Sequence, residues 1–240
     1  MDPAVAILQQ QMHEAMHAGT PLRIRAGGSK DFYGNACGGE LLDPRSHTGI
    51  VAYEPSELVV TARAGTPLAE LEATLDASKQ VLAFEPPHFG TGATIGGCVA
   101  AGLSGPRRAS AGAVRDFVLG ATLLSGRAEI AAFGGTAMKN VAGYDVSRLL
   151  AGSLGVLGVI LEVSLKVIPK PATEATLRFE MDQHSALQRM NAWGGQPLPV
   201  SATAWNGATG TGTGILHVRL SGARAAVAAA CSRLGGERLD

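Results

Sequence analysis

The chain has 240 residues, 46% of them hydrophobic, which is enough for one sizeable domain, or for one domain and part of another. Its 20 basic and 20 acidic side chains cancel. No block of lysine or arginine stands out, which argues against a nucleic-acid surface or an anchor for acidic lipids. No apolar run approaches the ~20 residues that a transmembrane helix needs, so we expect a soluble protein.

The three cysteines, Cys37, Cys98 and Cys231, are widely separated and show no Cys-x-x-Cys or Cys/His spacing. This pattern predicts neither a metal site, nor a disulfide framework, nor an iron–sulfur cluster. The N-terminus lacks the basic start and apolar core of a secretory signal. We therefore expect a cytoplasmic protein.

The first part of the chain is predicted to form a small α/β unit. Asp2 and Pro3 have the character of a helix cap and a first helical residue. Thr66 and Pro67 are predicted to cap a second helix in the same way. Strands are expected over residues 22–25, 49–53 and 58–63.

Glycine is unusually dense between residues 90 and 105. Such a density is tolerated where the backbone needs φ > 0 or where a partner touches the main chain. Apolar residues recur every four positions from Ile95, which predicts a short helix that begins near Thr94. Gly96 and Gly97 then fall in its first turn, where unpaired amides favour an anion such as a phosphate. The alternative is a glycine-rich loop that packs a helix against a sheet.

Two further stretches indicate the same kind of site. Residues 25–31 form a Gly-Gly-Ser turn directly after a predicted strand, with the Ser29 hydroxyl and the Lys30 ammonium within reach of an anion. Residues 152–160 are glycine-rich and run into a long strand. The three stretches together predict one ligand site built from distant segments.

Two common nucleotide motifs are absent from the sequence. The first predicted strand-to-helix turn carries no Gly-x-Gly-x-x-Gly, and no acidic residue follows at the spacing that NAD-binding proteins use. A Gly-x-x-x-x-Gly-Lys-Ser/Thr phosphate loop is also missing. These absences argue against NAD and ATP as ligands.

Several motifs in a fixed order resemble a known family. Residues 24–30, 92–97, 105–120, 139–145 and 152–160 read Ile-Arg-Ala-Gly-Gly-Ser-Lys, Gly-Ala-Thr-Ile-Gly-Gly, Gly-Pro-Arg-Arg with Val-Arg-Asp-Phe-Val-Leu-Gly, Lys-Asn-Val-Ala-Gly-Tyr-Asp and Gly-Ser-Leu-Gly-Val-Leu-Gly-Val-Ile. This series is similar to the PCMH-type FAD-binding domain of the vanillyl-alcohol oxidase superfamily, densely over residues 20–170. Residues 29–34, 85–89 and 138–145 most resemble the E subunits of bacterial glycolate oxidases.

The resemblance implies an α+β fold. Residues 1–170 are predicted to be a PCMH-type FAD-binding domain of two α/β subdomains, and Pro169 and Pro171 mark its end. Residues 171–240 are predicted to be a partial ferredoxin-like cap region. Their strand, helix, two strands and helix need one more strand to complete the layer. We therefore expect a truncated chain, or a sheet edge completed by another subunit.

The resemblance also implies a non-covalent FAD, because no His or Cys of the Gly-Gly-Ser loop is placed to attach a flavin. Backbone amides are expected to hold the diphosphate, and the loop over residues 102–105 is expected to lie along the flavin. The predicted cofactor-binding residues are Ala26, Gly27, Gly28, Ser29, Lys30, Gly92, Ala93, Thr94, Ile95, Gly96, Gly97, Gly102, Ser104, Gly105, Gly155, Val159 and Ile160.

Oxidation of a 2-hydroxy acid also needs a cation for the carboxylate and a base for the hydroxyl. The sequence does not assign these roles. Arg107 and Arg108 either contact the phosphates of the cofactor or lie on the surface. The candidates for the base and the cation, each with an ordinary structural alternative, are Tyr33, His88, Lys139 and Tyr144.

The resemblance implies an FAD-binding subunit of a glycolate oxidase or dehydrogenase. It would support the oxidation of glycolate to glyoxylate together with a D-type flavoprotein subunit and an iron–sulfur subunit, in the cytoplasm or, through that complex, at the inner face of the membrane. The alternative is a non-catalytic FAD-binding, assembly or electron-relay subunit. Leu154 and Val156 favour this alternative, because they stand where the catalytic relatives carry Glu and Thr.

Overall fold

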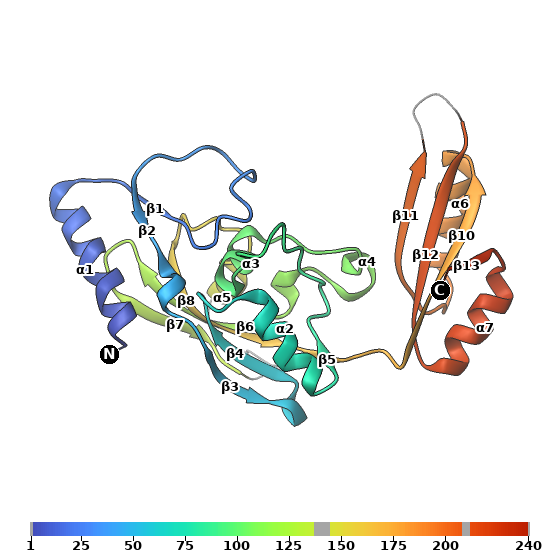
Figure 1. Cartoon of the computed structure of the whole chain (residues 1–240), viewed down its shortest axis with the longest axis horizontal. Helices are drawn as coiled ribbons and strands as arrows, with labels where there is room; N and C mark the ends of the chain where they lie inside the picture. Colours follow the sequence, from blue (N-terminus) through green and yellow to red (C-terminus); the bar gives the residue numbers. More distant parts are fainter. Residues whose placement is uncertain (1, 137–144, 208–211, 240) are drawn as a thin grey trace. The chain divides into compact units, whose positions relative to one another are not determined.

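A computed structural model describes residues 2–136, 145–207 and 212–239. The chain divides into two compact units, which are described separately here (Figure 1). The first comprises Met1–Gly105 and Ala113–Pro169, and the second comprises Pro106–Gly112 and Lys170–Asp240. The predicted domain boundary at residue 170 lies beside this division. The assignment of the parts as an FAD-binding domain and a cap region stays a prediction.

The N-terminal helix α1 (Pro3–Ala18) begins as the sequence predicts. The Asp2 carboxylate accepts a hydrogen bond of 2.9 Å from the amide of Ala4, and proline occupies the first turn, where an amide has no partner within the helix. Gly19, with φ of +66°, ends the helix. The buried face of α1 packs on strands of the first unit through Val5, Leu8, Met12, Leu124, Val159 and Leu161.

The main sheet of the first unit has five strands, and each neighbouring pair is antiparallel. Its central strand is buried on both faces, because the successive residues Val163 and Ser164, whose side chains point to opposite faces, are only 1% and 8% exposed. The Ser164 hydroxyl is paired with that of Thr61 at 2.8 Å, so its burial leaves no orphaned group. The order across the sheet is β3 (Ile50–Glu54), β4 (Val59–Arg63), β8 (Gly158–Lys166), β6 (Val118–Ser125) and β7 (Ile130–Gly134).

Shorter elements surround this sheet. The parallel pair β1 and β2 delivers the Gly-Gly-Ser loop, and the antiparallel pair β5 and β9 lies where the first unit ends. The bounds of these elements are β1 (Leu22–Ile24), β2 (Glu40–Leu42), η1 (Pro44–Ser46), η2 (Pro55–Glu57), α2 (Leu68–Ala77), β5 (Gln80–Val81), α3 (Ile95–Ala101), η3 (Val114–Asp116), α5 (Val146–Leu149) and β9 (Ile168–Pro169).

The predicted cap of α2 is wrong. Pro67 occupies the N-cap position and Thr66 does not bond to the helix. The Thr66 side chain is instead fully buried. Its hydroxyl accepts from the amide of Gly49 at 2.9 Å and donates to the carbonyl of Gly49 at 3.2 Å. A partner 17 residues away in the sequence has therefore replaced the local capping bond.

The second unit is a β-α-β-β-α-β layer with the strand order β11-β12-β10-β13. The expectation of a missing last strand is wrong, because β13 pairs antiparallel with β10. This strand has three residues, two of them exposed, so its sequence shows no alternation of apolar and polar positions. The elements are β10 (Thr173–Met181), α6 (Gln183–Gly194), β11 (Val200–Gly207), β12 (Gly214–Gly222), α7 (Arg224–Leu234) and β13 (Glu237–Leu239).

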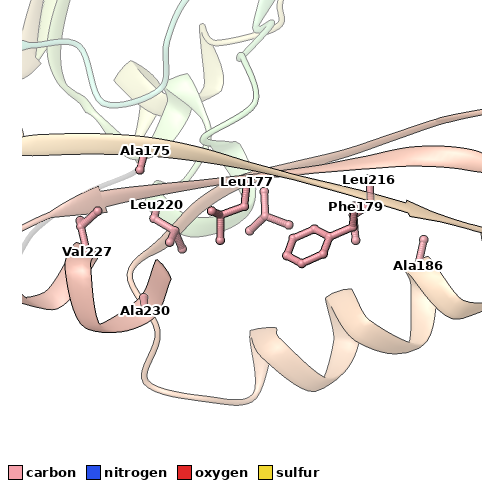
Figure 2. Packing of buried hydrophobic residues seen from close by; sticks show 9 residues of the cluster. Ala175, Leu177, Phe179, Ala186, Leu216, Leu220, Val227 and Ala230 are labelled. Atoms are coloured by element: carbon pink, nitrogen blue, oxygen red, sulfur yellow. The ribbon is translucent and has the colours of Figure 1, made fainter. Parts of the chain in front are cut away.

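The core of the second unit lies between the sheet and its two helices, α6 and α7. Figure 2 shows alternate residues of β10 and β12 on the face of the sheet toward these helices. Because successive side chains of a strand point to opposite faces, the period-two pattern of these strands builds one apolar layer. The buried residues of this layer are Ala175, Leu177, Phe179, Ala186, Leu216, Val218, Leu220, Val227 and Ala230.

The segment Pro106–Gly112, with the short helix α4 (Arg108–Ala111), belongs to the second unit. Arg107 is only 9% exposed, and its Nη2 lies 2.8 Å from Oε1 of Glu174 on β10. The Ser110 hydroxyl donates to the carbonyl of Ser201 on β11 at 2.9 Å. Arg107 is therefore a buried residue, whereas Arg108 is exposed.

We expect Arg107→Ala to lower the free energy of unfolding by about 1–3 kcal/mol, because Glu174 loses its charged donor in a partly buried network. Arg108→Ala is the matched control, since the neighbouring guanidinium is exposed. Urea denaturation of both variants measures the difference. Equal stabilities of the two variants would show that the pair contributes nothing.

Candidate functional site

A cavity of about 350 Å³ opens in the first unit at the Gly-Gly-Ser loop. A second, smaller cavity of about 90 Å³ shares six lining residues with it, so the two adjoin. The walls come from the loop after β1, the loop before α3, helix α3 itself and the start of β8. The structure thus brings together the three stretches that the sequence predicts to form one site.

Twelve of the predicted cofactor-binding residues line one or both cavities. They are Ala26, Gly27, Gly28, Ser29, Lys30, Gly92, Thr94, Gly96, Gly97, Gly155, Val159 and Ile160.

The other five predicted residues have bonds within the first unit and do not line these cavities. The carbonyl of Ala93 accepts from Leu68, and the amide of Ile95 donates to Thr66. The Ser104 hydroxyl accepts from the amide of Val114. Cofactor contact by these residues stays a prediction for Ala93, Ile95, Gly102, Ser104 and Gly105.

Gly27 and Gly92 must be glycine because the backbones of their two loops approach each other closely. A Cβ on Gly27 would overlap the carbonyl oxygen of Gly92. Conversely, a Cβ on Gly92 would lie 2.7 Å from the carbonyl oxygen of Gly27. The two loops therefore cross at a distance that only glycine permits.

The prediction that unpaired amides in the first turn of α3 are available to a phosphate is wrong. Among the described residues the amide of Gly96 donates to the carbonyl of Ala64 at 2.8 Å, and that of Gly97 donates to the Thr94 hydroxyl at 3.2 Å. A Cβ on Gly96 would lie only 2.6 Å from Cβ of Ala64. Gly96 thus packs α3 against β4, and its amide is not available to an anion.

The Gly-Gly-Ser loop offers unpaired donors instead. In the described part of the chain, the amides of Gly27, Gly28, Ser29 and Lys30 donate to no protein acceptor. Gly28 has φ of +67°, a left-handed conformation that turns successive amides toward one side. Unpaired amides of this kind on a cavity wall suit the oxygens of a diphosphate.

Cationic side chains on the same wall differ in their pairing. Arg25 is neutralised by Asp31, whose Oδ2 lies 2.6 Å from Nη2 of Arg25. No carboxylate pairs with Lys30 within the described ranges, and partial burial lowers the pKa of its ammonium. Lys30 is therefore a cation available to an anionic ligand.

The smaller cavity has a different chemistry. Its walls are apolar and include Ile24, Ala64, Val159 and Ile160. Gly155 also lines this cavity and, having no side chain, does not project into it. Such walls favour the close, dry packing of an aromatic ring. An anion-binding wall beside an apolar cleft is what a cofactor with both phosphates and a ring requires.

The candidate catalytic residues are not gathered at this site. Tyr33 lines the larger cavity and is 45% exposed. His88 lines neither cavity, and its Nε2 lies 2.8 Å from Oε2 of Glu72 on α2. Lys139 and Tyr144 lie outside the described residues. The base and the substrate cation stay unassigned.

Several residues of the cavity walls are not among the predicted ones. Ala100 and Ala101 line the larger cavity four positions after Gly96 and Gly97, so helical periodicity was a signal that pointed to them. Cys37 lines the same cavity from a loop in which no periodic pattern exists. Its thiol is exposed, whereas that of Cys98 is buried.

We expect a thiol reagent at pH 8 to modify Cys37 rapidly and Cys98 only after unfolding. Burial raises the pKa of Cys98 to about 12, so its reactive thiolate is scarce and also inaccessible. Bound FAD should slow the modification of Cys37, which lies on the cavity wall. Peptide mass spectrometry after timed labelling measures both rates. Labelling of Cys98 in the folded chain would contradict this account.

The described residues show no group of three or more His, Cys, Asp or Glu side chains that could hold a metal ion. Within the same ranges, every helix falls short of the length and hydropathy that a bilayer-spanning segment needs.

Glycine-rich loops beside an apolar cleft are features of proteins that bind a dinucleotide cofactor. The family model described as an FAD binding domain matches residues 5–134. The chain belongs to this FAD-binding family, and FAD is its cofactor.

The chain resembles several named proteins in sequence and solved structures in fold. The chain is 47% identical over 232 residues to glycolate oxidase subunit GlcE of Escherichia coli K12, covering 97% of this chain and 65% of that protein. It is 36% identical to a D-lactate dehydrogenase of Anaerostipes hadrus over 58% of this chain and 29% of that protein. An alkyldihydroxyacetonephosphate synthase structure superimposes with a TM-score of 0.72 at 16% identity, covering 95% of this chain and 47% of that one, which shows the fold.

Proposed function

We propose that the chain is an FAD-binding subunit of a glycolate oxidase or dehydrogenase complex that supports the oxidation of glycolate to glyoxylate. The observation that carries this proposal is the 47% identity to a glycolate oxidase subunit along almost the whole of this chain. The proposed partners are a D-type flavoprotein subunit and an iron–sulfur subunit that accepts the electrons. Identity to a GlcD subunit of Bacillus subtilis, 31% over 64% of this chain, supports the link to this class of complex.

In this proposal the residues of the two cavities bind the cofactor without a covalent bond. The amides of the Gly-Gly-Ser loop and the Lys30 ammonium hold the diphosphate, and the apolar walls around Ile160 hold the ring. FAD supplies the electron acceptor that the oxidation of a 2-hydroxy acid requires. The role of residues 1–170 is then cofactor binding, and that of residues 171–240 is to act as a cap.

The second candidate is a non-catalytic subunit that binds FAD for assembly or for electron relay. Leu154 and Val156 are 47% and 83% exposed, so the positions where catalytic relatives carry Glu and Thr present apolar side chains here. Leu154 lines both cavities, so no charged side chain at this position interacts with the bound cofactor. This feature favours dependence on a partner for the chemical step.

An anaerobic titration with glycolate tests the proposal. The chain is purified with its cofactor, glycolate is added without oxygen, and the flavin absorption bands are followed. Bleaching by glycolate, and not by acetate, which lacks the hydroxyl group, supports a catalytic flavin subunit. Bound flavin that is reduced only after the partner subunits are added favours the relay alternative. Flavin that stays oxidised even in the assembled complex would sink the glycolate assignment.

A further inference from the structure

The loop that precedes α3 holds two residues in an unfavourable backbone conformation. Glu85 has φ of +47° and Phe89 has φ of +53°, although neither is glycine. Residues of this kind persist where surrounding contacts determine the backbone, and they gather at ligand sites. The contacts of residues 85–90 therefore determine the backbone conformation of this loop.

A side-chain hydrogen bond fixes this loop to α2. The Nε2 of His88 lies 2.8 Å from Oε2 of Glu72, which the helix presents from its second turn. Both side chains are only 37% and 38% exposed, so the pair is partly shielded from water. Because His88 and Glu72 line neither cavity, their pairing cannot act on a ligand directly.

The same loop holds the side chain of Lys30. The Lys30 Nζ lies 3.5 Å from the carbonyl oxygen of His88 and 5.9 Å from the centre of the Phe89 ring. Phe89 is in turn packed edge-on against Phe32, with ring centres 5.0 Å apart. The contact of the Lys30 Nζ with the Ser29 hydroxyl, at 3.5 Å, is also weak. Within the described residues, no short bond therefore commits the ammonium to the protein.

We infer that the Glu72–His88 pair is a positioning device, which holds residues 88 and 89 so that the Lys30 ammonium stays on the cavity wall for the diphosphate of FAD. This inference rests on the proposed cofactor site. In this inference Lys30 contacts the diphosphate directly, whereas His88 and Glu72 affect FAD binding only through the position of Lys30. A flexible lysine that is held in place before binding loses less conformational freedom on binding, which raises affinity.

A double-mutant cycle tests the inference through FAD binding rather than through activity. Apoprotein is titrated with FAD, and the quenching of flavin fluorescence gives Kd. We expect Lys30→Ala and His88→Ala each to raise Kd about tenfold, as for the loss of a hydrogen bond to a charged group. The double variant should bind no more weakly than Lys30→Ala alone, because His88 acts through Lys30.

Two further variants keep the test decisive. His88→Gln retains a donor toward Glu72 and should recover part of the affinity, and Glu72→Gln replaces His88→Ala if the latter fails to fold. His184→Ala is the matched control, since this exposed histidine belongs to the second unit and its side chain bonds to Gln188 at 2.9 Å. Circular dichroism verifies that each variant is folded.

Additive losses in the double variant, or an unchanged Kd in His88→Ala, would overturn the inference. A wild-type chain that is folded but binds no FAD would instead overturn the proposed site itself. The two failures are thus distinguishable in one set of titrations.

Discussion

Gly27→Ala is expected to raise the Kd for FAD about 100-fold or more, because a single methyl group at this position separates two loops of the cofactor site. The Cβ would overlap the carbonyl oxygen of Gly92. This contact is between backbone atoms, so no change of side-chain rotamer can relieve it. The loops must move apart, and the amides of the Gly-Gly-Ser turn then leave the positions in which they converge on an anion.

Gly38→Ala is the matched control, because it lies in the same connection between β1 and β2 and its Cβ would meet no atom within 4 Å. Fluorescence titration of the two apoproteins measures the effect. Near-wild-type affinity in Gly27→Ala would contradict the position assigned to the phosphate loop. A loss in both variants would show that the whole connection tolerates no change.

Ala100→Leu is the second substitution with a large expected effect. Ala100 lies on α3 and lines both cavities, so a larger side chain would occupy the space in which we propose that FAD lies. We expect the Kd for FAD to rise more than about tenfold with little loss of thermal stability, since leucine is nearly as good a helix former as alanine.

Ala6→Leu is the control for this change, because Ala6 is exposed on α1, away from the cavities. Thermal unfolding and FAD titration are measured on both variants. A normal Kd in Ala100→Leu would show that the cofactor does not occupy the two cavities. A strong fall in melting temperature would indicate that the side chain enters the core instead.

The features that the sequence predicts correctly depend on short stretches of chain. The cap of α1 follows from Asp2 and Pro3, and the start of α3 follows from Thr94 and the apolar spacing after it. Each signal is complete within one or two turns of helix. Local physics therefore decides these boundaries.

The features that the sequence missed depend on distant partners. Thr66 bonds to Gly49, and the amides of Ile95 and Gly96 find their acceptors on Thr66 and Ala64, in the segment that follows β4. Strand β13 exists because β10 offers an open edge, since its own three residues carry no pattern. A sequence read locally cannot show which distant group will satisfy a donor.

The glycine-rich stretches illustrate how far the site could be predicted. Their density correctly indicated that something approaches the backbone closely. At Gly27, Gly96 and Gly105 the approaching group is protein, because a Cβ there would collide with Gly92, Ala64 and Glu85. Composition does not distinguish a glycine that packs backbone on backbone from one that makes room for a cofactor. Only the three-dimensional arrangement separates the two roles.

Calorimetric titration of the folded apoprotein with FAD measures whether this chain binds FAD between the Gly-Gly-Ser loop and α3. We expect saturable binding of one FAD per chain, which is lost in Gly27→Ala and retained in Gly38→Ala. A folded chain that takes up no FAD, or that binds it equally well in both variants, would show that FAD does not bind there.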